Sequence, residues 1–488
     1  MCDTGKSYGL SGTIDILPDE VLLDIFDFYR RNPVSYPISL VWTWPLLVHV
    51  CRRWRQIIFE SPDRLNLQIL CTHKTSVRNN LSIWPNFPIS IHYDYTGRSL
   101  RPEGVGNVIA ALRHSNRVSH VELIVTSSLL EKLVSVMQEP FPVLTHIEIY
   151  SRGDSDERGL TGGFLGGSAP RLQNICLNNL PFLALPTLLS STNNLLTLTL
   201  DNIPPTGYIS PEAMVACLAV LPRLENLVIG FQSHTPHPYR IYGPPVTRTV
   251  LPALTFFTVH AASEYLEDLV ARIDGPQLER IHVDCLNPLV DIPVVQLPKF
   301  FDRSVGSRLT TFSHGQARFC WGSFSFVISR LEKRPCWDWA PARGTIKRTI
   351  ISCEGIGRQV PKIAQVLSRF SAILSNLVHL DLDVRPEEGH QLKDITNAEW
   401  LHLLRQFSAV QTLHVSLELA GYITCALEDI IEEVVTDVLP SLELICLEVQ
   451  PVPSVEKFIA VRRLSGHPVT VVNTMAEFSK SLESYVSK

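Results

Sequence analysis

The hexapeptide Leu224-Glu-Asn-Leu-Val-Ile229 shows the pattern that decides the fold: an apolar residue followed by apolar residues three and five positions later. The same pattern recurs along the chain, often after a proline. Seven copies are spaced 23 to 30 residues apart and begin at Val118, Leu144, Leu172, Leu195, Leu224, Leu254 and Leu278. Three further copies, 33 and 32 residues apart, begin at Leu377, Val410 and Leu442. Recurrence of this kind indicates a repeat architecture.

Alternating apolar residues in each copy are typical of a β-strand. Between the copies lie stretches with a helical look, such as Val105–His114, Leu129–Met137, Pro211–Val220 and Ala364–Leu374. Strand–helix–strand units of this length form right-handed crossovers and a parallel sheet, and each unit buries its apolar face on the next. We therefore predict an α/β fold, a leucine-rich-repeat-like β/α solenoid. A closed barrel of eight β/α units is the alternative, which the irregular spacing disfavours.

The periodicity divides the chain after residue 68 into three parts. Residues 69–284 and 376–488 carry the repeats, and the second part ends in a cap with an expected strand at Pro468–Val472 and a helix at Met475–Val486. Residues 285–375 break the period. This insertion is rich in aromatic residues, which indicate a locally packed segment or, alternatively, a binding patch; they are Phe319, Trp321, Phe324, Phe326, Trp337 and Trp339.

The composition narrows the classes of function. The chain has 488 residues, of which 45% are hydrophobic and 19% charged, with a net charge of −5. Nucleic-acid binders usually carry a basic footprint, and the one dense cluster here, Arg52, Arg53 and Arg55, is interpreted as a solvated helix face. No nucleic-acid partner is expected.

Several sequence features bear on the compartment. Residues 1–13 are expected to be a flexible N-terminus, without the apolar core of a secretory signal. No apolar run is long enough to span a bilayer. The eleven cysteines contain no C-x-x-C pair, so we expect reduced thiols, buried at Cys176, Cys285 and Cys446, and no zinc site. These features predict a soluble protein of the cytoplasm, the nucleus or both.

Residues 14–68 form a separate helical module. Pro18 suits the first position of a helix, and Asp19 and Glu20 complement its dipole. An apolar stripe follows at Leu22, Ile25, Phe26 and Tyr29, and a second stretch, Trp44–Phe59, has one face with Leu47, Val50, Cys51, Trp54 and Ile58. So small a module cannot bury all of these side chains by itself. Either the rest of the chain or a partner protein is expected to cover the surplus.

The module resembles an F-box. The resemblance rests on Leu17-Pro18, Glu20-Val21-Leu22 and Ile25-Phe26, and on Leu47-Val-His-Val-Cys-Arg-Arg-Trp-Arg55. The following Ser61-Pro-Asp-Arg-Leu-Asn-Leu67 is similar to the form in basidiomycete fungal F-box proteins, although the loop Arg30–Thr43 is longer than usual.

The resemblance implies docking on the adaptor subunit of an SCF-type, cullin-based ubiquitin ligase. Carried over to this chain, the adaptor-binding residues are Leu17, Pro18, Leu22, Ile25, Phe26, Val50, Cys51 and Trp54. The repeats would then bind an unknown protein target.

The target would meet the outward side chains of the strands, which alternation identifies. They are His146, Glu148, Tyr150, Asn174, Asp201, His260, Arg280, His282, Asp284, Asp381, Asp383, His414 and Glu448. An ordinary solvated strand face is the alternative for any one of them. Two long segments, Ser151–Ser168 and Phe231–Pro252, are expected to be loops that extend this surface.

Motifs for catalysis are missing from the sequence. There is no G-x-S-x-G, no H-E-x-x-H and no phosphate-binding G-x-x-x-x-G-K-[ST]. We therefore expect no enzyme activity, no cofactor and no metal. Two other hypotheses remain, a protein-binding scaffold that joins no ligase and, less favoured, a β/α hydrolase whose site is assembled from distant residues.

Overall fold

In the computed structural model, the chain forms two compact units. Unit 1 comprises Met1–Gly153 and Gly163–Leu172, and unit 2 comprises Asp154–Gly162 and Gln173–Lys488. The structure describes residues 16–31, 43–74, 77–94, 102–152, 159–160, 162–232, 247–286, 295–305, 313–320, 323–329, 348–354, 360–384, 395–430, 437–448 and 455–473. The helix expected at Met475–Val486 lies outside these residues, as do Trp321, Trp337, Trp339 and most of the Phe231–Pro252 segment.

The described part of unit 1 begins with three short helices, α1 (Asp19–Arg31), α2 (Thr43–Leu47) and α3 (Arg52–Glu60). Leu22 and Phe26 of α1 are buried, and the Phe26 ring lies 4.7 Å from that of Trp54 in α3. Arg53 ties α3 to the start of α1, because it donates to the carboxylate of Asp19 at 2.6 Å and to a backbone carbonyl nearby. The arginine cluster is thus partly a helix-to-helix clamp.

The second apolar stretch of the sequence is two helices, whereas its periodicity suggested one. Cys51 is extended, with φ −154° and ψ 173°, and its sulfur accepts the backbone N–H of Trp54 as the N-cap of α3. Because an N-cap residue leaves the helical conformation, the chain turns between α2 and α3.

An aromatic cluster joins these helices to the first strands of unit 1. Trp44 packs edge-on against Trp84, with ring centroids 5.1 Å apart, and against Phe87. Phe59 of α3 contacts the same two rings. The Trp44 indole also donates to the carbonyl of Gln68 at 3.0 Å. Edge-on aromatic contacts with a satisfied indole are a stable arrangement, so α2 and α3 are anchored to the repeats.

Four parallel strands follow in unit 1. They are β1 (Ile69–Cys71), β2 (Ile89–Asp94), β3 (Val118–Thr126) and β4 (His146–Arg152), paired in that order. The helices between them are α4 (Val77–Ile83), α5 (Pro102–Leu112) and α6 (Ser127–Val134). Their apolar residues face the strand side chains that alternation buries, such as Val121 and Leu123.

Unit 2 continues the same construction. Among the residues that the structure describes, five strands come first in its sheet and pair in parallel. They are β5 (Asn174–Asn178), β6 (Thr197–Ile203), β7 (Asn226–Phe231), β9 (Phe256–Ala261) and β11 (Arg280–Cys285). The last four are also parallel: β15 (His379–Val384), β16 (Thr412–Val415), β17 (Leu444–Leu447) and β18 (Thr470–Asn473). A separate parallel pair joins β8 (Thr249–Val250) to β10 (Ile273–Asp274).

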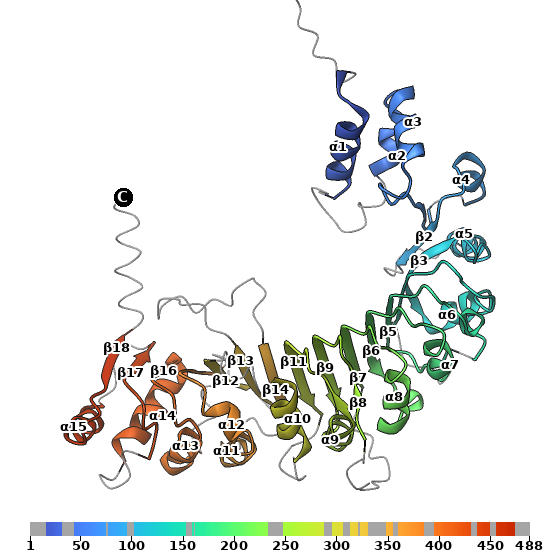
Figure 1. Ribbon diagram of the computed structural model, residues 1–488. Coiled ribbons are helices and arrows are strands. Elements are labelled where there is room, and N and C mark those ends of the chain that lie inside the picture. Colours follow the sequence, from blue (N-terminus) through green and yellow to red (C-terminus); the bar gives the residue numbers. More distant parts are fainter. Residues whose placement is uncertain are drawn as a thin grey trace, which may run out of the picture. The chain divides into compact units, whose positions relative to one another are not determined.

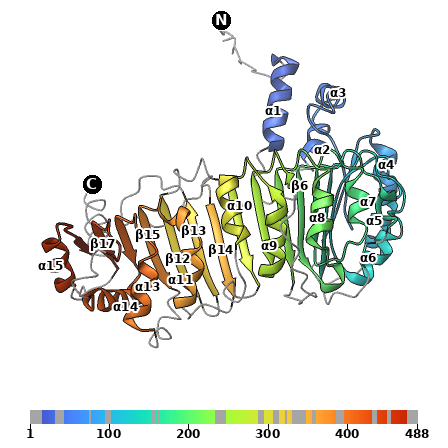
Figure 2. The same cartoon turned by 60° about the horizontal axis from the view of Figure 1, so that its bottom comes forward.

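The helices of unit 2 cover one face of the large sheet that contains β5 and β18 (Figures 1 and 2). They are α7 (Leu185–Leu189), α8 (Pro211–Leu218), α9 (Ser263–Arg272), α10 (Gln296–Val305), α11 (Val360–Ser368), α12 (Ser371–Leu374), α13 (Asn397–Leu404), α14 (Leu417–Glu428) and α15 (Glu456–Leu464). The core lies between the two layers, where the repeated leucines are buried. This topology confirms the predicted leucine-rich-repeat-like β/α fold with a large parallel sheet.

A tight turn precedes most strands and explains the recurring proline. The first residue of a repeat donates its backbone N–H to the carbonyl three residues earlier, at 3.0 to 3.3 Å; this holds for Leu144, Leu172, Leu195, Leu224, Leu254, Leu278, Leu377 and Leu442. In six of these turns a proline stands at the second position, for example Pro222 and Pro276. Proline favours that position because its φ is already fixed near −65°.

The segment that breaks the period adds a reversed strand to the sheet. β12 (His314–Cys320) and β14 (Arg348–Glu354) run parallel to β15 and β11, and β13 (Ser323–Ser329) lies antiparallel between them. Phe319, Phe324 and Phe326 are buried. These three rings therefore belong to the packed interior rather than to an exposed aromatic patch.

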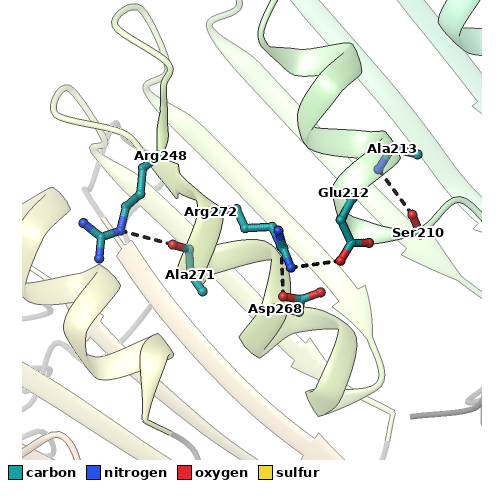
Figure 3. A network of polar contacts seen from close by, with 7 residues as sticks. All are labelled: Ser210, Glu212, Ala213, Arg248, Asp268, Ala271 and Arg272. Carbon is teal, nitrogen blue, oxygen red and sulfur yellow. Dashed lines mark hydrogen bonds and ion pairs between the residues drawn. The ribbon is translucent and has the colours of Figure 1, made fainter. Parts of the chain in front are cut away.

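Neighbouring helices are joined by charged groups. The carboxylate of Glu267 in α9 accepts three backbone N–H groups at the start of α10, from Val295, Gln296 and Leu297, at 2.7 to 2.8 Å. In Figure 3, Arg272 of α9 reaches Asp268 in its own helix and Glu212 in α8, both at 2.9 Å. These contacts tie α9 to α8 on one side and to α10 on the other.

Candidate functional site

The strand face opposite the helices carries polar side chains in both units. Every predicted target-binding residue lies on a strand or directly after the end of one. At these positions the alternation of the strand turns the side chain away from the core. Each of these residues is at least partly exposed. In unit 2 the face is crossed by side-chain pairs that bridge neighbouring strands.

Histidine–carboxylate pairs dominate the face of unit 2. His260 lies 2.8 Å from Asp284 on the next strand, and His314 lies 2.8 Å from Asp381. His414 approaches Glu448 at 3.4 Å, with poor hydrogen-bond geometry. His314 was not among the predicted residues, because its strand lies in the segment without the repeat pattern.

Arg318 and Asp383 extend this row. The Nε of Arg318 donates to Asp383 at 2.8 Å, between β12 and β15. On β11, Arg280 stacks over the ring of Phe256 at 5.1 Å, a cation–π contact. Beside it, burial lowers the pKa of His282, and nearby His260 lowers it further, while Asp284 opposes the shift.

Amide side chains gather at the other end of the unit 2 face, around Asp201. Asn178 donates to the Asp201 carboxylate at 3.0 Å and accepts from Asn202 at 3.3 Å. Gly230 of β7 lies beside the carboxylate, so close that a Cβ at this position would stand 2.3 Å from Asp201 Oδ1. Asn174, the predicted residue of this region, is partly exposed at the start of β5.

Unit 1 carries a second polar strand face. His92 and Glu122 form an ion pair at 2.9 Å, which raises the pKa of His92 and lowers that of Glu122. Glu148 stands beside Glu122 in register. Burial, and then the charge of Glu122, raise its pKa, although a hydrogen bond from Tyr150 opposes the shift.

Two histidines of this face, His120 and His146, lie next to each other with their rings tilted. The ring of His146 lies 5.3 Å from that of His120. Burial lowers the pKa of both residues, and His120 is further lowered by the neighbouring histidines. The predicted residues His146, Glu148 and Tyr150 therefore share one face with His92, His120 and Glu122, which the prediction did not include.

The N-terminal helices present a different surface, which is apolar. Of the predicted adaptor-binding residues, Leu22 and Phe26 are buried inside unit 1, Leu17, Cys51 and Trp54 are half-buried, and Pro18, Ile25 and Val50 are exposed. On α1 a second stripe faces outward, with exposed fractions of 40 to 68% at Val21, Ile25, Phe28 and Tyr29. The helical spacing could have identified Val21 and Phe28. Val21, Ile25, Phe28 and Tyr29 stand at positions i, i+4, i+7 and i+8, which lie on one face of a helix.

The repeated strands, covered on one face by helices, form a leucine-rich-repeat-like β/α fold. Among solved structures it resembles the leucine-rich repeat-containing protein LegL7 of Legionella pneumophila, with 12% identity, 83% of this chain and 99% of that chain covered, and a TM-score of 0.27. It also resembles a chain of a TLR13–ssRNA13 complex, with 13% identity, 78% of this chain and 45% of that chain covered, and a TM-score of 0.28.

No family model matches the sequence, and no curated protein matches it. Within the described residues, no three His, Cys, Asp or Glu side chains are placed to hold a metal ion, and no helix there is long and apolar enough to cross a membrane.

Proposed function

We propose that the chain is the substrate receptor of an SCF-type, cullin-based ubiquitin ligase, acting in the cytoplasm or nucleus. Its N-terminal helices would dock on the adaptor, and its strand face would hold a target protein. The observation that carries this proposal is the outward apolar stripe of α1.

The stripe is unusual because α1 already buries its other side. Leu22, Leu23 and Phe26 fill the interior of unit 1, so the helix is apolar on two faces. Exposed apolar rows at this spacing are the pattern by which a helix enters a groove on another protein. Leu46 and Val50, which follow on α2 and the turn after it, are also exposed and supply further apolar area.

The polar strand face suits the second role. Its hydrogen-bonding side chains stand on strands, which hold them more rigidly than loops would. In this proposal the chain performs no chemistry of its own and requires no cofactor. It would hold a target near the transferase, so that proximity supplies the acceleration.

Co-purification with the adaptor tests the docking role. The double variant Ile25→Asp with Phe28→Asp changes only exposed positions of α1, and it should abolish adaptor binding. Leu183→Asp with Leu464→Asp is the matched control, because both leucines are exposed in unit 2. Retention of the adaptor by the α1 variant would refute the proposal, as would loss of binding in both variants alike.

A scaffold that joins no ligase is the second candidate. The paired side chains of the strand face support it equally, since they do not depend on α1. In that case the wild-type chain would fail to bind the adaptor, while still capturing a partner through the strand face.

A further inference from the structure

The strand face of unit 2 carries an exposed arginine, Arg280, whose charge is not paired within the part of the chain that the structure describes. Two arginine side chains are described on the strands of this unit. Arg318 donates to the carboxylate of Asp383 at 2.8 Å. Arg280 contacts the ring of Phe256 and, among the described residues, no carboxylate or other hydrogen-bond acceptor. A guanidinium has five N–H donors and stays charged, so the donors of Arg280 remain available to another molecule.

The ring of Phe256 holds this guanidinium in place. The two residues are direct partners in the register of β9 and β11, and the guanidinium carbon lies 5.1 Å from the ring centroid. Stacking of this kind uses the flat face of the guanidinium and leaves its N–H edge free. Because the stack also restricts the side chain before binding, a ligand of Arg280 would lose less free energy in ordering it.

The outward side chains around the stack include no carboxylate on β7, β9 or β11 at this level of the sheet or at the next. They are Asn226, Phe256 and Arg280 at one level, and Val228, Thr258 and His282 at the next. Burial is the main cause that lowers the pKa of His282, so its imidazole is mostly neutral near pH 7. Phe256 and Val228 are both partly exposed. The site therefore combines one free cation with accessible apolar surface.

We propose that Arg280 binds the carboxylate of an aspartate or glutamate on the bound protein, while a neighbouring apolar side chain of that protein packs on Phe256. The two oxygens of a carboxylate match the fork of N–H groups that a guanidinium presents. Arginine and aromatic residues are also the types that contribute most to protein interfaces. The assignment rests on the proposed role of the strand face in target binding, and it gives the target a chemical feature, an acidic residue beside an apolar one.

A labelled dodecapeptide of four Gly-Leu-Glu repeats serves as the probe, with fluorescence anisotropy on the full chain at low ionic strength. Because the chain has a net charge of −5, diffuse attraction does not favour an acidic peptide. Arg280→Gln should weaken binding about tenfold, as expected for the loss of a charge-assisted pair. Arg280→Lys keeps the charge but not the fork, and it should weaken binding about threefold.

Arg405→Gln is the matched control, because it removes the same charge from an exposed position at the end of α13. It should change binding less than about twofold. Equal weakening by Arg280→Gln and Arg405→Gln would mean that only the overall charge matters, and it would overturn the assignment. Both arginines are exposed, so neither substitution disturbs the core.

Two further comparisons test the stack and the chemistry of the ligand. Phe256→Leu keeps an apolar side chain but removes the ring, and it should weaken binding about threefold; unchanged binding would contradict the proposal. Replacing the glutamates of the peptide by glutamine should abolish binding. Phosphoserine is another anion that an arginine fork recognises, and binding of a phosphoserine version alone would overturn the choice of a carboxylate.

Adaptor co-purification is measured on the same variants. A chain that binds the acidic peptide through Arg280 but does not bind the adaptor would reject the ligase role alone. A chain that binds the adaptor but whose peptide binding is unchanged in Arg280→Gln would reject the acidic-residue site alone.

Discussion

The carboxylate of Glu267 should be one of the strongest single supports of unit 2. The side chain is 8% exposed and accepts the first N–H groups of α10, which have no acceptor within their own helix. Replacing it by alanine removes three charge-assisted hydrogen bonds between α9 and α10.

The expected loss follows from the exposure of the three donors. Leu297 is buried, so its N–H would be left without a partner, whereas Val295 is exposed and its N–H can bond to water. Charge-assisted hydrogen bonds contribute about 1.5–3 kcal/mol each. If the hydrogen bond from the buried N–H of Leu297 counts in full and the other two count in part, Glu267→Ala should lower the free energy of unfolding by about 3–5 kcal/mol. Glu267→Gln keeps one acceptor oxygen and should cost about half as much.

Hydrogen exchange reports this change locally, which suits a long repeat chain in which unfolding need not be two-state. Amides of residues 295–305 should lose protection in Glu267→Ala. Glu428, which accepts the N–H groups of Lys457 and Phe458 at the longer distances of 3.1 and 3.3 Å, is the matched comparison; its alanine variant should lose only about 1–2 kcal/mol. If exchange at 295–305 were unchanged in Glu267→Ala, or if both variants behaved alike, the reasoning would be refuted.

Three further predictions concern unit 1, the strand face and the helix layer. The pKa of His120 is lowered in the folded chain, so the unfolded chain binds more protons and the free energy of unfolding falls as the pH drops below about 6.5. In His120→Gln this free energy, measured by urea denaturation, should decrease less between about pH 7 and 5 than in the wild type. Gly230→Ala should displace the Asp201 carboxylate from the close approach described above and cost about 1–3 kcal/mol in thermal unfolding, whereas an unchanged transition would contradict that contact. Arg272→Met should cost about 1–3 kcal/mol because it leaves Asp268 beside another carboxylate, and double-mutant cycles with Asp268→Asn should show coupling.

The repeat leucines illustrate what could be predicted from the sequence. Their spacing and alternation locate most of the strands in advance, because a strand that buries one face must place apolar residues at every second position. The prolines before them mark the turns for the same local reason. Polar residues between the leucines likewise indicate the outward face, so that His260, Asp284, Asp381 and His414 were found from the pattern.

The pairing of these side chains depended on tertiary structure. His314 lies 67 residues from Asp381 in the sequence, and Arg318 lies 65 residues from Asp383. These pairs meet because β12 enters the sheet next to β15. Where the repeat pattern is missing, the local sequence of a strand does not indicate which other strand it will pair with.

The sequence by itself determined the β/α repeat, the apolar N-terminal helices and the face on which polar residues gather, because each depends on periodicity within one segment. Only the tertiary structure decided which face of α1 is buried, since Leu22 and Phe26 find their partners in α2 and α3. It also decided that Val21, Ile25, Phe28 and Tyr29 of α1 stay exposed. Burial is a property of contacts between distant segments, and a linear pattern does not contain those contacts.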